Sequence, residues 1–495
     1  EAAQTRQANQ YYLALAYLGE GQHEIALDVL AKVEITPENK DFYGGVQLAR
    51  AMALAGLNRR AEAIEPLQKY LATGPAGGDA LACRLQLIDA LIPDNRLDEA
   101  LQVHSQITGQ DAQQPLYLEA THRLAEAALV AGKHDEAMGL FAVLTQDGQP
   151  PAAGAQGWAG LGWANFRAGK LEPAAVAFGQ LVERYPESPL AAEAAIMKAK
   201  ALGQVGRSED ALDAYLLVVT AYDKSEHAVP AMIEAARLQE KLGRQAEAIP
   251  LLWRIVQEHP REKTVDGVLY QLAWLLSDQG QADEADRLFQ QITAEYPDSD
   301  YWADATYRLA QRAASTKQYD RARQFAGQLT AANCTPEILE HALFLQGQLA
   351  ASTQRWQDAV GPLQDLLKQF PESSLGGPAT FWTAEALYQQ KEYEKAAEWF
   401  GKLKPEQLSE EPTWAATIAL RRAQMLAEQQ QWQEAYDLAN GIWNSEEQAH
   451  GQRVGVHLQR EEDAALALLG GGDGDLHGQR RLAHGRRPRA HIPVG

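Results

Sequence analysis

An alanine recurs every 37 residues along most of this 495-residue chain. Each one follows a Gly or polar residue by five positions, and most precede an apolar residue by four, as Gly169, Ala174 and Phe178 show. Eleven alanines keep this register and a twelfth follows after 39 residues: Ala26, Ala63, Ala100, Ala137, Ala174, Ala211, Ala248, Ala285, Ala322, Ala359, Ala396 and Ala435. Such a period predicts structural repeats that stack on their neighbours to share one core.

Each repeat predicts two antiparallel helices. In residues 158–169 the apolar side chains recur at helical spacing, and Gly169 is the residue type that ends a helix. The second helix then carries Ala174 and Phe178 on one face, and Pro186 ends it. Ser188 followed by Pro189 predicts the cap and first turn of the next helix. The small alanine lets the two helices cross closely.

The repeat unit resembles the tetratricopeptide consensus at seven positions: Trp158, Leu161, Gly162, Gly169, Ala174, Phe178 and Pro186. The resemblance covers residues 8–444. It implies an all-α, right-handed α-solenoid of about twelve helical hairpins, which binds peptide or protein partners in its concave groove. The period is 37 instead of the usual 34 or so. We expect the extra residues to follow the proline, where they lengthen either the turn between repeats or the start of each first helix.

The periodicity stops near residue 445, so we predict a repeat array over 1–444 and a separate tail over 445–495. Residues 451–495 contain seven Arg and no Lys. A segment of this composition cannot bury a core, and we expect it to be disordered. Two other interpretations stay open: a basic tail that docks on an acidic surface, or the product of a shifted reading frame.

Aromatic residues mark a candidate partner-binding surface. The position fifteen before the key alanine is expected to face the groove, and it is aromatic in four successive repeats: Tyr270, Tyr307, Phe344 and Phe381. Four further aromatics occupy other groove positions: Trp163, Phe166, Trp274 and Tyr388. Large rings dominate binding hot spots, so we predict that these eight contact a partner. The alternative is that the ladder rings only pack between neighbouring repeats. A second series, Tyr319, Trp356, Tyr393 and Trp432, is interpreted as packing within each hairpin.

The sequence gives no indication of catalysis. It contains no phosphate-binding loop, dinucleotide loop or nucleophile elbow, and we expect neither a cofactor nor a metal. His23 and Glu24 begin like a zinc-protease motif, but Leu27 stands where the second histidine belongs. The net charge of −21 argues against nucleic acid as a partner. Cys83 and Cys334 lie too many repeats apart to form a disulfide. A clamp for chaperone tails is not predicted either, because the asparagine it needs is missing.

The turn between repeats has a recurring sequence. It is Tyr-Pro-Glu-Ser at 185–188, Tyr-Pro-Asp-Ser at 296–299 and Phe-Pro-Glu-Ser at 370–373. It is similar to the linkers of tetratricopeptide proteins of the bacterial cell envelope, such as the Tol–Pal coordinator and outer-membrane assembly lipoproteins. That resemblance implies a scaffold for envelope assembly in the periplasm, with a cytoplasmic location as the alternative.

The chain begins at Glu1 and has no apolar run long enough to span a membrane. A cleaved signal or a lipid anchor outside this chain therefore agrees with the sequence. So does a different function, in which the chain is the non-catalytic region of a larger enzyme or regulatory protein.

Overall fold

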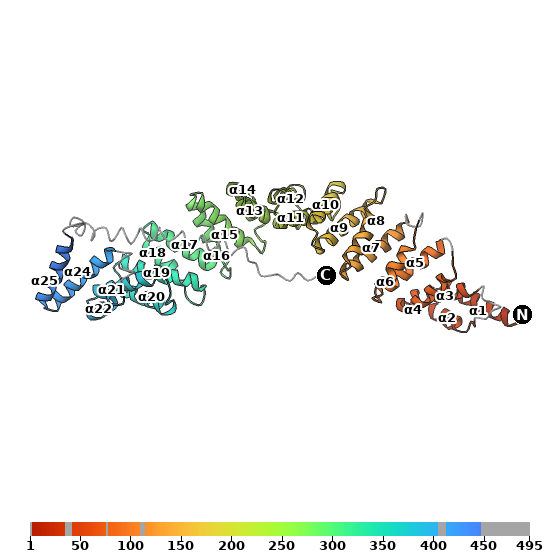
Figure 1. Cartoon of the computed structure of the whole chain (residues 1–495), viewed down its shortest axis with the longest axis horizontal. Coiled ribbons are helices and arrows are strands. Elements are labelled where there is room, and N and C mark those ends of the chain that lie inside the picture. Colours follow the sequence, from red (N-terminus) through yellow and green to blue (C-terminus); the bar gives the residue numbers. More distant parts are fainter. Residues whose placement is uncertain (1, 35–41, 76–77, 109–113, 404–411, 447–495) are drawn as a thin grey trace. The chain divides into compact units, whose positions relative to one another are not determined.

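The computed structural model describes residues 2–34, 42–75, 78–108, 114–403 and 412–446 (Figure 1). Within these residues there are 24 helices and no strand, which confirms the prediction of an all-α fold. None of the helices in this part of the chain has the length and apolarity that crossing a membrane requires. The predicted tail lies outside the described residues from position 447 onward.

The helices form twelve hairpins, each made of a first and a second helix. The first helices are α1 (Ala2–Gly19), α3 (Tyr43–Gly56), α5 (Gly78–Leu91), α7 (Pro115–Val130), α9 (Pro151–Arg167), α11 (Ala191–Gln204), α13 (Ala228–Lys241), α15 (Val265–Asp278), α17 (Trp302–Ser315), α19 (Pro336–Ser352), α21 (Gly376–Gln389) and α24 (Pro412–Glu428). The second helices are α2 (His23–Ala31), α4 (Arg60–Leu71), α6 (Leu97–Ser105), α8 (His134–Leu144), α10 (Leu171–Arg184), α12 (Ser208–Ala221), α14 (Gln245–Glu258), α16 (Ala282–Glu295), α18 (Tyr319–Ala326), α20 (Trp356–Gln369), α22 (Tyr393–Phe400) and α25 (Trp432–Glu446).

All twelve key alanines are buried. The most exposed of them, Ala435, reaches only 8%. Each lies on a second helix, and for most of the array that helix packs against both its own first helix and the next one. A larger side chain at these positions would push the helices apart, because protein interiors are close-packed. The alanine period therefore reports a steric requirement that is repeated in every hairpin.

The residue five positions before each key alanine has a left-handed backbone in all twelve hairpins. Six of these residues are glycines, with φ between +73° and +84°: Gly21, Gly132, Gly169, Gly206, Gly243 and Gly280. The other six carry side chains, with φ between +57° and +63°: Asn58, Asn95, Lys317, Gln354, Lys391 and Gln430. This confirms the predicted stop signal, which is a glycine in half of the hairpins and a polar residue in the other half.

The turn between repeats agrees with the sequence in one respect and differs in another. Helix α10 ends at Arg184, two residues before Pro186, as predicted. The predicted cap at Ser188 is wrong, because α11 begins at Ala191 with Leu190 as its N-cap. Ser188 instead closes the turn, where its hydroxyl oxygen accepts a hydrogen bond from the Leu190 amide at 3.2 Å. The residues that follow Pro186 thus lie in this turn, before α11 begins.

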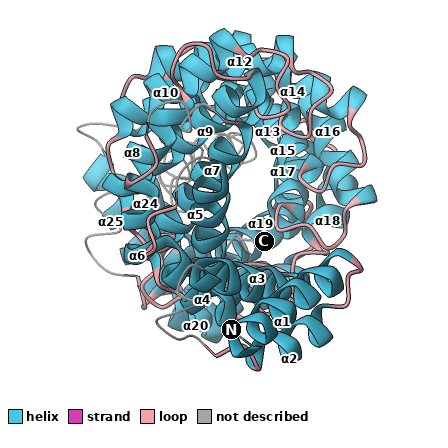
Figure 2. Cartoon of the chain, turned by 90° about the vertical axis from the view of Figure 1, so that its right-hand side faces the viewer, coloured by secondary structure: helices cyan, strands magenta, loops and turns pink. Residues whose placement is uncertain are grey.

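The chain divides into two compact units, residues 1–251 and 252–495, with the division inside α14. In unit 1, Figure 2 shows α5, α7 and α9 on the inner side and α6, α8, α10 and α12 on the outer side. In unit 2, α15, α17 and α19 lie on the inner side, with α16 and α18 outside them. We call the side of the first helices that faces away from the second helices the inner face.

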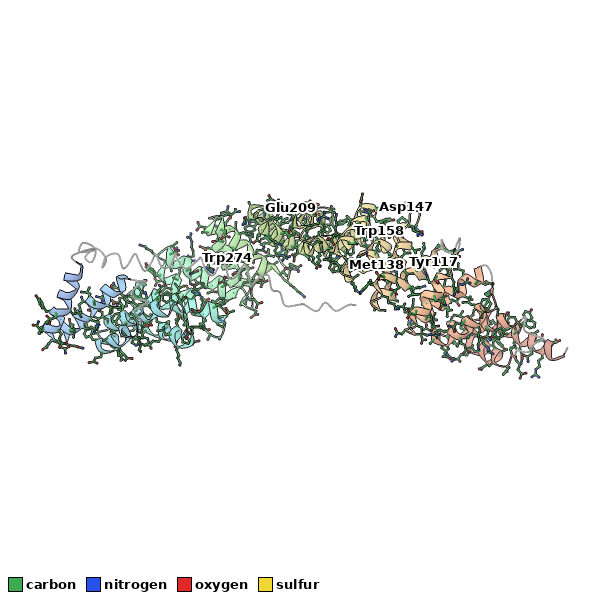
Figure 3. All side chains as sticks on the ribbon, viewed as in Figure 1. Tyr117, Met138, Asp147, Trp158, Glu209 and Trp274 are labelled. Atoms are coloured by element: carbon green, nitrogen blue, oxygen red, sulfur yellow. The ribbon has the colours of Figure 1, made fainter. Side chains whose placement is uncertain are left out.

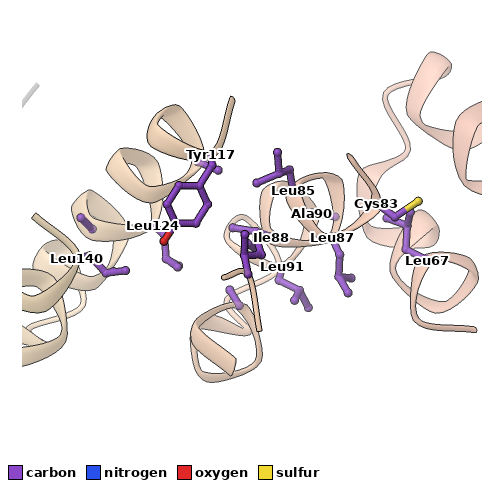
Figure 4. Packing of buried hydrophobic residues seen from close by; sticks show 14 of the residues in the cluster. Leu67, Cys83, Leu85, Leu87, Ile88, Ala90, Leu91, Tyr117, Leu124 and Leu140 are labelled. Atoms are coloured by element: carbon purple, nitrogen blue, oxygen red, sulfur yellow. The ribbon is translucent and has the colours of Figure 1, made fainter. Parts of the chain in front are cut away.

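Unit 1 has a core that continues from one hairpin to the next. Tyr117 of α7 is buried in it and Met138 of α8 packs against it, and both are labelled in Figure 3. Figure 4 shows further members, among them Leu67, Cys83 and Ile88 from α4 and α5. Cys83 and Cys334 are both free thiols, as predicted. Because neighbouring hairpins share this core, no single hairpin buries its apolar face alone.

Candidate partner-binding surface

The four rings of the predicted ladder lie on successive first helices of unit 2. Tyr270, Tyr307 and Phe381 are 5–6% exposed, and Phe344 is half-buried. Such burial leaves little ring surface for a partner. It agrees with the alternative interpretation, in which the rings pack between neighbouring repeats, and the binding role of the ladder stays a prediction.

Tyr270 shows how a ladder ring connects three helices. Its ring stacks on Tyr301, which directly precedes α17, at a centroid distance of 4.6 Å. It also contacts Phe289 of α16 edge-on at 6.1 Å. Its hydroxyl donates a hydrogen bond to the carboxylate of Asp304 on α17. The ring therefore ties its own hairpin to the next one.

The other four candidate aromatics are all half-buried, and the structure divides them between the two units. Trp163 and Phe166 belong to unit 1 and contact each other edge-on at 6.0 Å. Trp274 and Tyr388 belong to unit 2, with two first helices, α17 and α19, between them. The eight predicted residues thus belong to two units, two of them to unit 1 and six to unit 2.

A second row of residues on the inner face emerges from the structure. It consists of the residue eleven positions before each key alanine, and we call it the inner row. Its members are Leu15, Met52, Asp89, Glu126, Trp163, Lys200, Arg237, Trp274, Gln311, Gln348, Glu385 and Gln424. All except Gln348 and Glu385 are half-buried or exposed. The inner row therefore presents more side-chain surface than the ladder does.

Several inner-row residues are paired with the next first helix. The partner is the residue fourteen before the next key alanine, which we call the pairing position. Arg123 in this position holds Asp89, with 2.9 Å between Nη2 and Oδ1. Burial raises the pKa of the Asp89 carboxyl, and the Arg123 charge opposes that shift. The guanidinium of Arg308 lies 4.5 Å above the ring of Trp274 in the same way.

The pair of Glu385 and Arg421 is the most enclosed of these contacts. Two hydrogen bonds join them, at 2.9 Å from Nε to Oε2 and 2.7 Å from Nη2 to Oε1. The guanidinium also lies 4.6 Å above the ring of Tyr388, whose hydroxyl donates to Gln424 Oε1 at 2.8 Å. Burial raises the pKa of Tyr388. Because its groups satisfy one another, this cluster holds α21 and α24 together.

Exposed apolar side chains accompany the inner row in unit 1. Met52 is 48% exposed on α3, and Val130, one turn beyond Glu126 on α7, is 80% exposed. Tyr12 of α1 is 61% exposed. Among the described residues, no cluster of three or more His, Cys, Asp or Glu side chains is arranged to hold a metal. This surface can offer apolar contact and charge to a partner.

Trp163 and Trp274 were predicted from the sequence, but the pairing across neighbouring first helices was not. The signal was present. Asp89 and Arg123 have opposite charges and are 34 residues apart, and Glu385 and Arg421 are 36 apart. The key-alanine register was needed to recognise these intervals as neighbouring positions on adjacent helices.

Comparison with known families supports the repeat assignment. Three segments, residues 160–188, 243–305 and 344–407, match models of the tetratricopeptide repeat. The chain therefore contains tetratricopeptide repeats, as its register predicted. No curated protein matches the sequence.

Several solved structures are similar to this chain. The structure of Naa15/Naa10 bound to HypK is 15% identical, with 90% of this chain and 69% of that one covered and a TM-score of 0.41. PilF of Pseudomonas aeruginosa is 13% identical, with 46% and 97% covered and a TM-score of 0.28. The C-terminal part of a tetratricopeptide repeat-containing protein from Cytophaga hutchinsonii is 14% identical, with 60% and 98% covered and a TM-score of 0.32.

Proposed function

We propose that this chain is a non-catalytic scaffold that holds segments of partner proteins against the inner face of its first helices. Its tetratricopeptide repeats support a role in protein binding. The observation that carries the proposal is the exposure of apolar side chains on that face, Val130 and Met52 above all. Covering such side chains releases water and stabilises a complex.

We further propose that the scaffold acts in assembly of the bacterial cell envelope. The support is the similarity of the recurring turn. In the structure the turn serines have a structural role, since Ser299 Oγ donates to Asp266 Oδ2 at 2.6 Å and so ties the turn to the preceding first helix. The turn sequence therefore supports only a relationship with envelope proteins. Its serines do not identify a group that binds a partner. Recovery of the native protein in the periplasmic fraction after osmotic shock is the expected result, and recovery with the cytoplasm would contradict it.

Site-specific photo-crosslinking in the native organism tests the proposed binding face. A benzophenone side chain replaces Val130 or Met52 on first helices, or Val176 on second helix α10. Val176 is a matched control because it is an apolar side chain with 64% exposure on a second helix. We expect a discrete crosslinked partner from Val130 and Met52 and none from Val176. Equal crosslinking from both kinds of helix would rule out the inner face as the binding surface.

Alanine substitutions at Tyr307 and Phe344 test the ladder separately. If the rings bind a partner, both variants lose affinity for the crosslinked protein. If the rings only pack between repeats, the variants lose stability and keep their affinity, and the ladder is then excluded as a binding site. Removing a buried ring costs about 3–5 kcal/mol of folding free energy. Phe344, being half-buried, should therefore be the milder of the two.

A further inference from the structure

Three successive inner-row residues of unit 1 differ in chemistry. Glu126 of α7 is an acid, Trp163 of α9 is an aromatic and Lys200 of α11 is a base. The side chain of Glu126 is 59% exposed, Lys200 is exposed and Trp163 is half-buried. Neighbouring first helices contact each other here, so the three side chains form consecutive steps along one face.

The pairing position opposite Glu126 is Gly160. A Cβ atom at this glycine would lie 2.1 Å from Cε1 of Phe141, so the buried phenylalanine occupies the space that a side chain would need. No arginine can stand there as Arg123 does beside Asp89. In the described part of the chain, the ionisable side chain beside Glu126 is that of His122, with 3.7 Å between Nδ1 and Oε2, and this ring is charged only when protonated. The carboxylate is therefore open to a basic group from outside.

The pairing position opposite Lys200 is Glu234, which is engaged elsewhere. Arg237, one turn along the same helix, donates from Nε to Glu234 Oε2 at 2.8 Å. Within the described residues no carboxylate lies within 4 Å of the Lys200 ammonium group. Lys200 is thus positioned to attract an acidic group.

The pairing position opposite Trp163 is Met197, which is 5% exposed. The ring of Trp163 contacts Phe166 and Phe178 edge-on, at 6.0 and 5.9 Å. The equivalent Trp274 has the Arg308 guanidinium over its face. Without such an arginine, Trp163 keeps part of its ring for an apolar side chain.

We propose that Glu126, Trp163 and Lys200 select a partner segment that carries a basic, an apolar and an acidic residue in this order along the three helices. Packed helices lie about 8–10 Å apart, and an extended chain advances about 3.3 Å per residue. The three partner residues should therefore be about three positions apart. The inference rests on the proposed function and specifies the chemistry of the partner.

Synthetic peptides test this selection by fluorescence anisotropy at low salt. The three probes share one length and one neutral background, and differ only in a core of Arg-x-x-Leu-x-x-Asp, Arg-x-x-Leu-x-x-Arg or Asp-x-x-Leu-x-x-Asp. The wild-type protein should bind the mixed peptide about threefold to tenfold more tightly than the other two, because each of those places one like charge opposite the protein. Raising the salt to 1 M should reduce the difference.

Two charge reversals provide the decisive comparison. Glu126→Lys should prefer the Asp/Asp peptide and Lys200→Glu the Arg/Arg peptide, each by a similar factor. Both side chains are exposed, so both variants should fold. Glu126→Gln and Lys200→Gln are milder variants that should lose the preference for the mixed peptide without reversing it. Equal binding of all three peptides, an unchanged preference in the reversals, or no binding by the wild type would overturn the inference. Crosslinking at Val130 would still stand in each case, so the two proposals fail separately.

Discussion

At the scale of single residues, the stop before each second helix has a left-handed backbone, which is unfavourable for any residue that carries a Cβ atom. Gln354, with φ of +57°, adopts a conformation that costs residues with a Cβ atom about 1–2 kcal/mol. Gly280, with φ of +78°, occupies the same place in another hairpin without that cost. The twelve stops thus differ in strain although they share a left-handed backbone.

Replacing Gln354 with glycine should stabilise its hairpin by about 1 kcal/mol, because the strain is relieved and no contact of a buried side chain is lost. Gln364→Gly inside α20 is the matched control and should cost about 1 kcal/mol. Hydrogen exchange of the α19 and α20 amides measures both local free energies. Destabilisation by Gln354→Gly would show that the side chain contributes more than its backbone conformation costs.

A buried histidine predicts that the stability of unit 1 depends on pH. His104 is 7% exposed and stacks on Tyr117 at 5.0 Å. The hydroxyl of Thr121 donates to the Tyr117 carbonyl at 2.8 Å, so it accepts from the Nε2–H of His104, also at 2.8 Å. Burial lowers the pKa of His104 to about 4. The folded state thus keeps the ring neutral where the unfolded chain already binds a proton.

Because the folded pKa of His104 lies below the unfolded value, stability is complete above about pH 6.5 and falls as the pH drops toward 4. From pH 7.5 to pH 5 the loss should be about 2 kcal/mol. Hydrogen exchange of α6 and α7 at the two pH values measures it, after correction for the intrinsic exchange rate. His104→Gln should remove most of the difference. If His104→Gln loses as much folding free energy between pH 7.5 and pH 5 as the wild type does, other groups cause the pH dependence.

At the scale of helices, α9 is built to let bulky neighbours approach its backbone. A Cβ atom at Gly160 or Gly162 would lie 2.1 Å from Phe141 or 2.6 Å from Phe178. The two rings are each 1% exposed and fill the space that the glycines leave. Glycine normally weakens a helix by up to about 1 kcal/mol, and here close packing offsets that cost.

Gly160→Ala should therefore destabilise unit 1 by about 1–3 kcal/mol through overpacking against Phe141. Gly139→Ala on α8 is the control, since its added Cβ meets no atom within 4 Å and should stabilise its helix by about 1 kcal/mol. Urea unfolding of the full chain compares the two variants. Combining Gly160→Ala with Phe141→Leu should restore part of the loss. Purely additive effects would show that the two residues do not conflict.

The helices were largely predictable because the key alanine, the stop residue and Pro186 each act within a few residues of themselves. The start of α11 was not, because Ser188 bonds within the turn and leaves the cap to Leu190. The burial of Tyr307 could not be predicted from the sequence, because a ring on the inner side of a first helix can either face a partner or pack on the next hairpin. Only tertiary contacts distinguish these two cases.

The second aromatic series shows the same limit. Tyr319, Trp356 and Tyr393 pack against buried clusters, whereas Trp432 at the equivalent position is 67% exposed.

At the scale of the whole molecule, the described residues repeat one hairpin twelve times, with a constant core and a varied inner face. The key alanines are all buried, whereas the inner row passes through apolar, acidic, aromatic, basic and amide side chains. An arginine in the pairing position contacts the inner-row residues Asp89, Trp274 and Glu385. The pairing positions opposite Glu126, Trp163 and Lys200 hold no arginine. A scaffold built this way keeps its fold independent of its binding preference, because different positions determine the two.

The central claim is that partners bind on the inner face of the first helices, and one affinity comparison tests it most directly. The partner identified by crosslinking is titrated against the wild type, Val130→Asp and Val176→Asp. Both side chains are largely exposed, at 80% and 64%, so neither change should unfold the protein. We expect a loss of affinity of at least about tenfold for Val130→Asp and no change for Val176→Asp. Equal affinities for the two variants, or a loss confined to Val176→Asp, would contradict it.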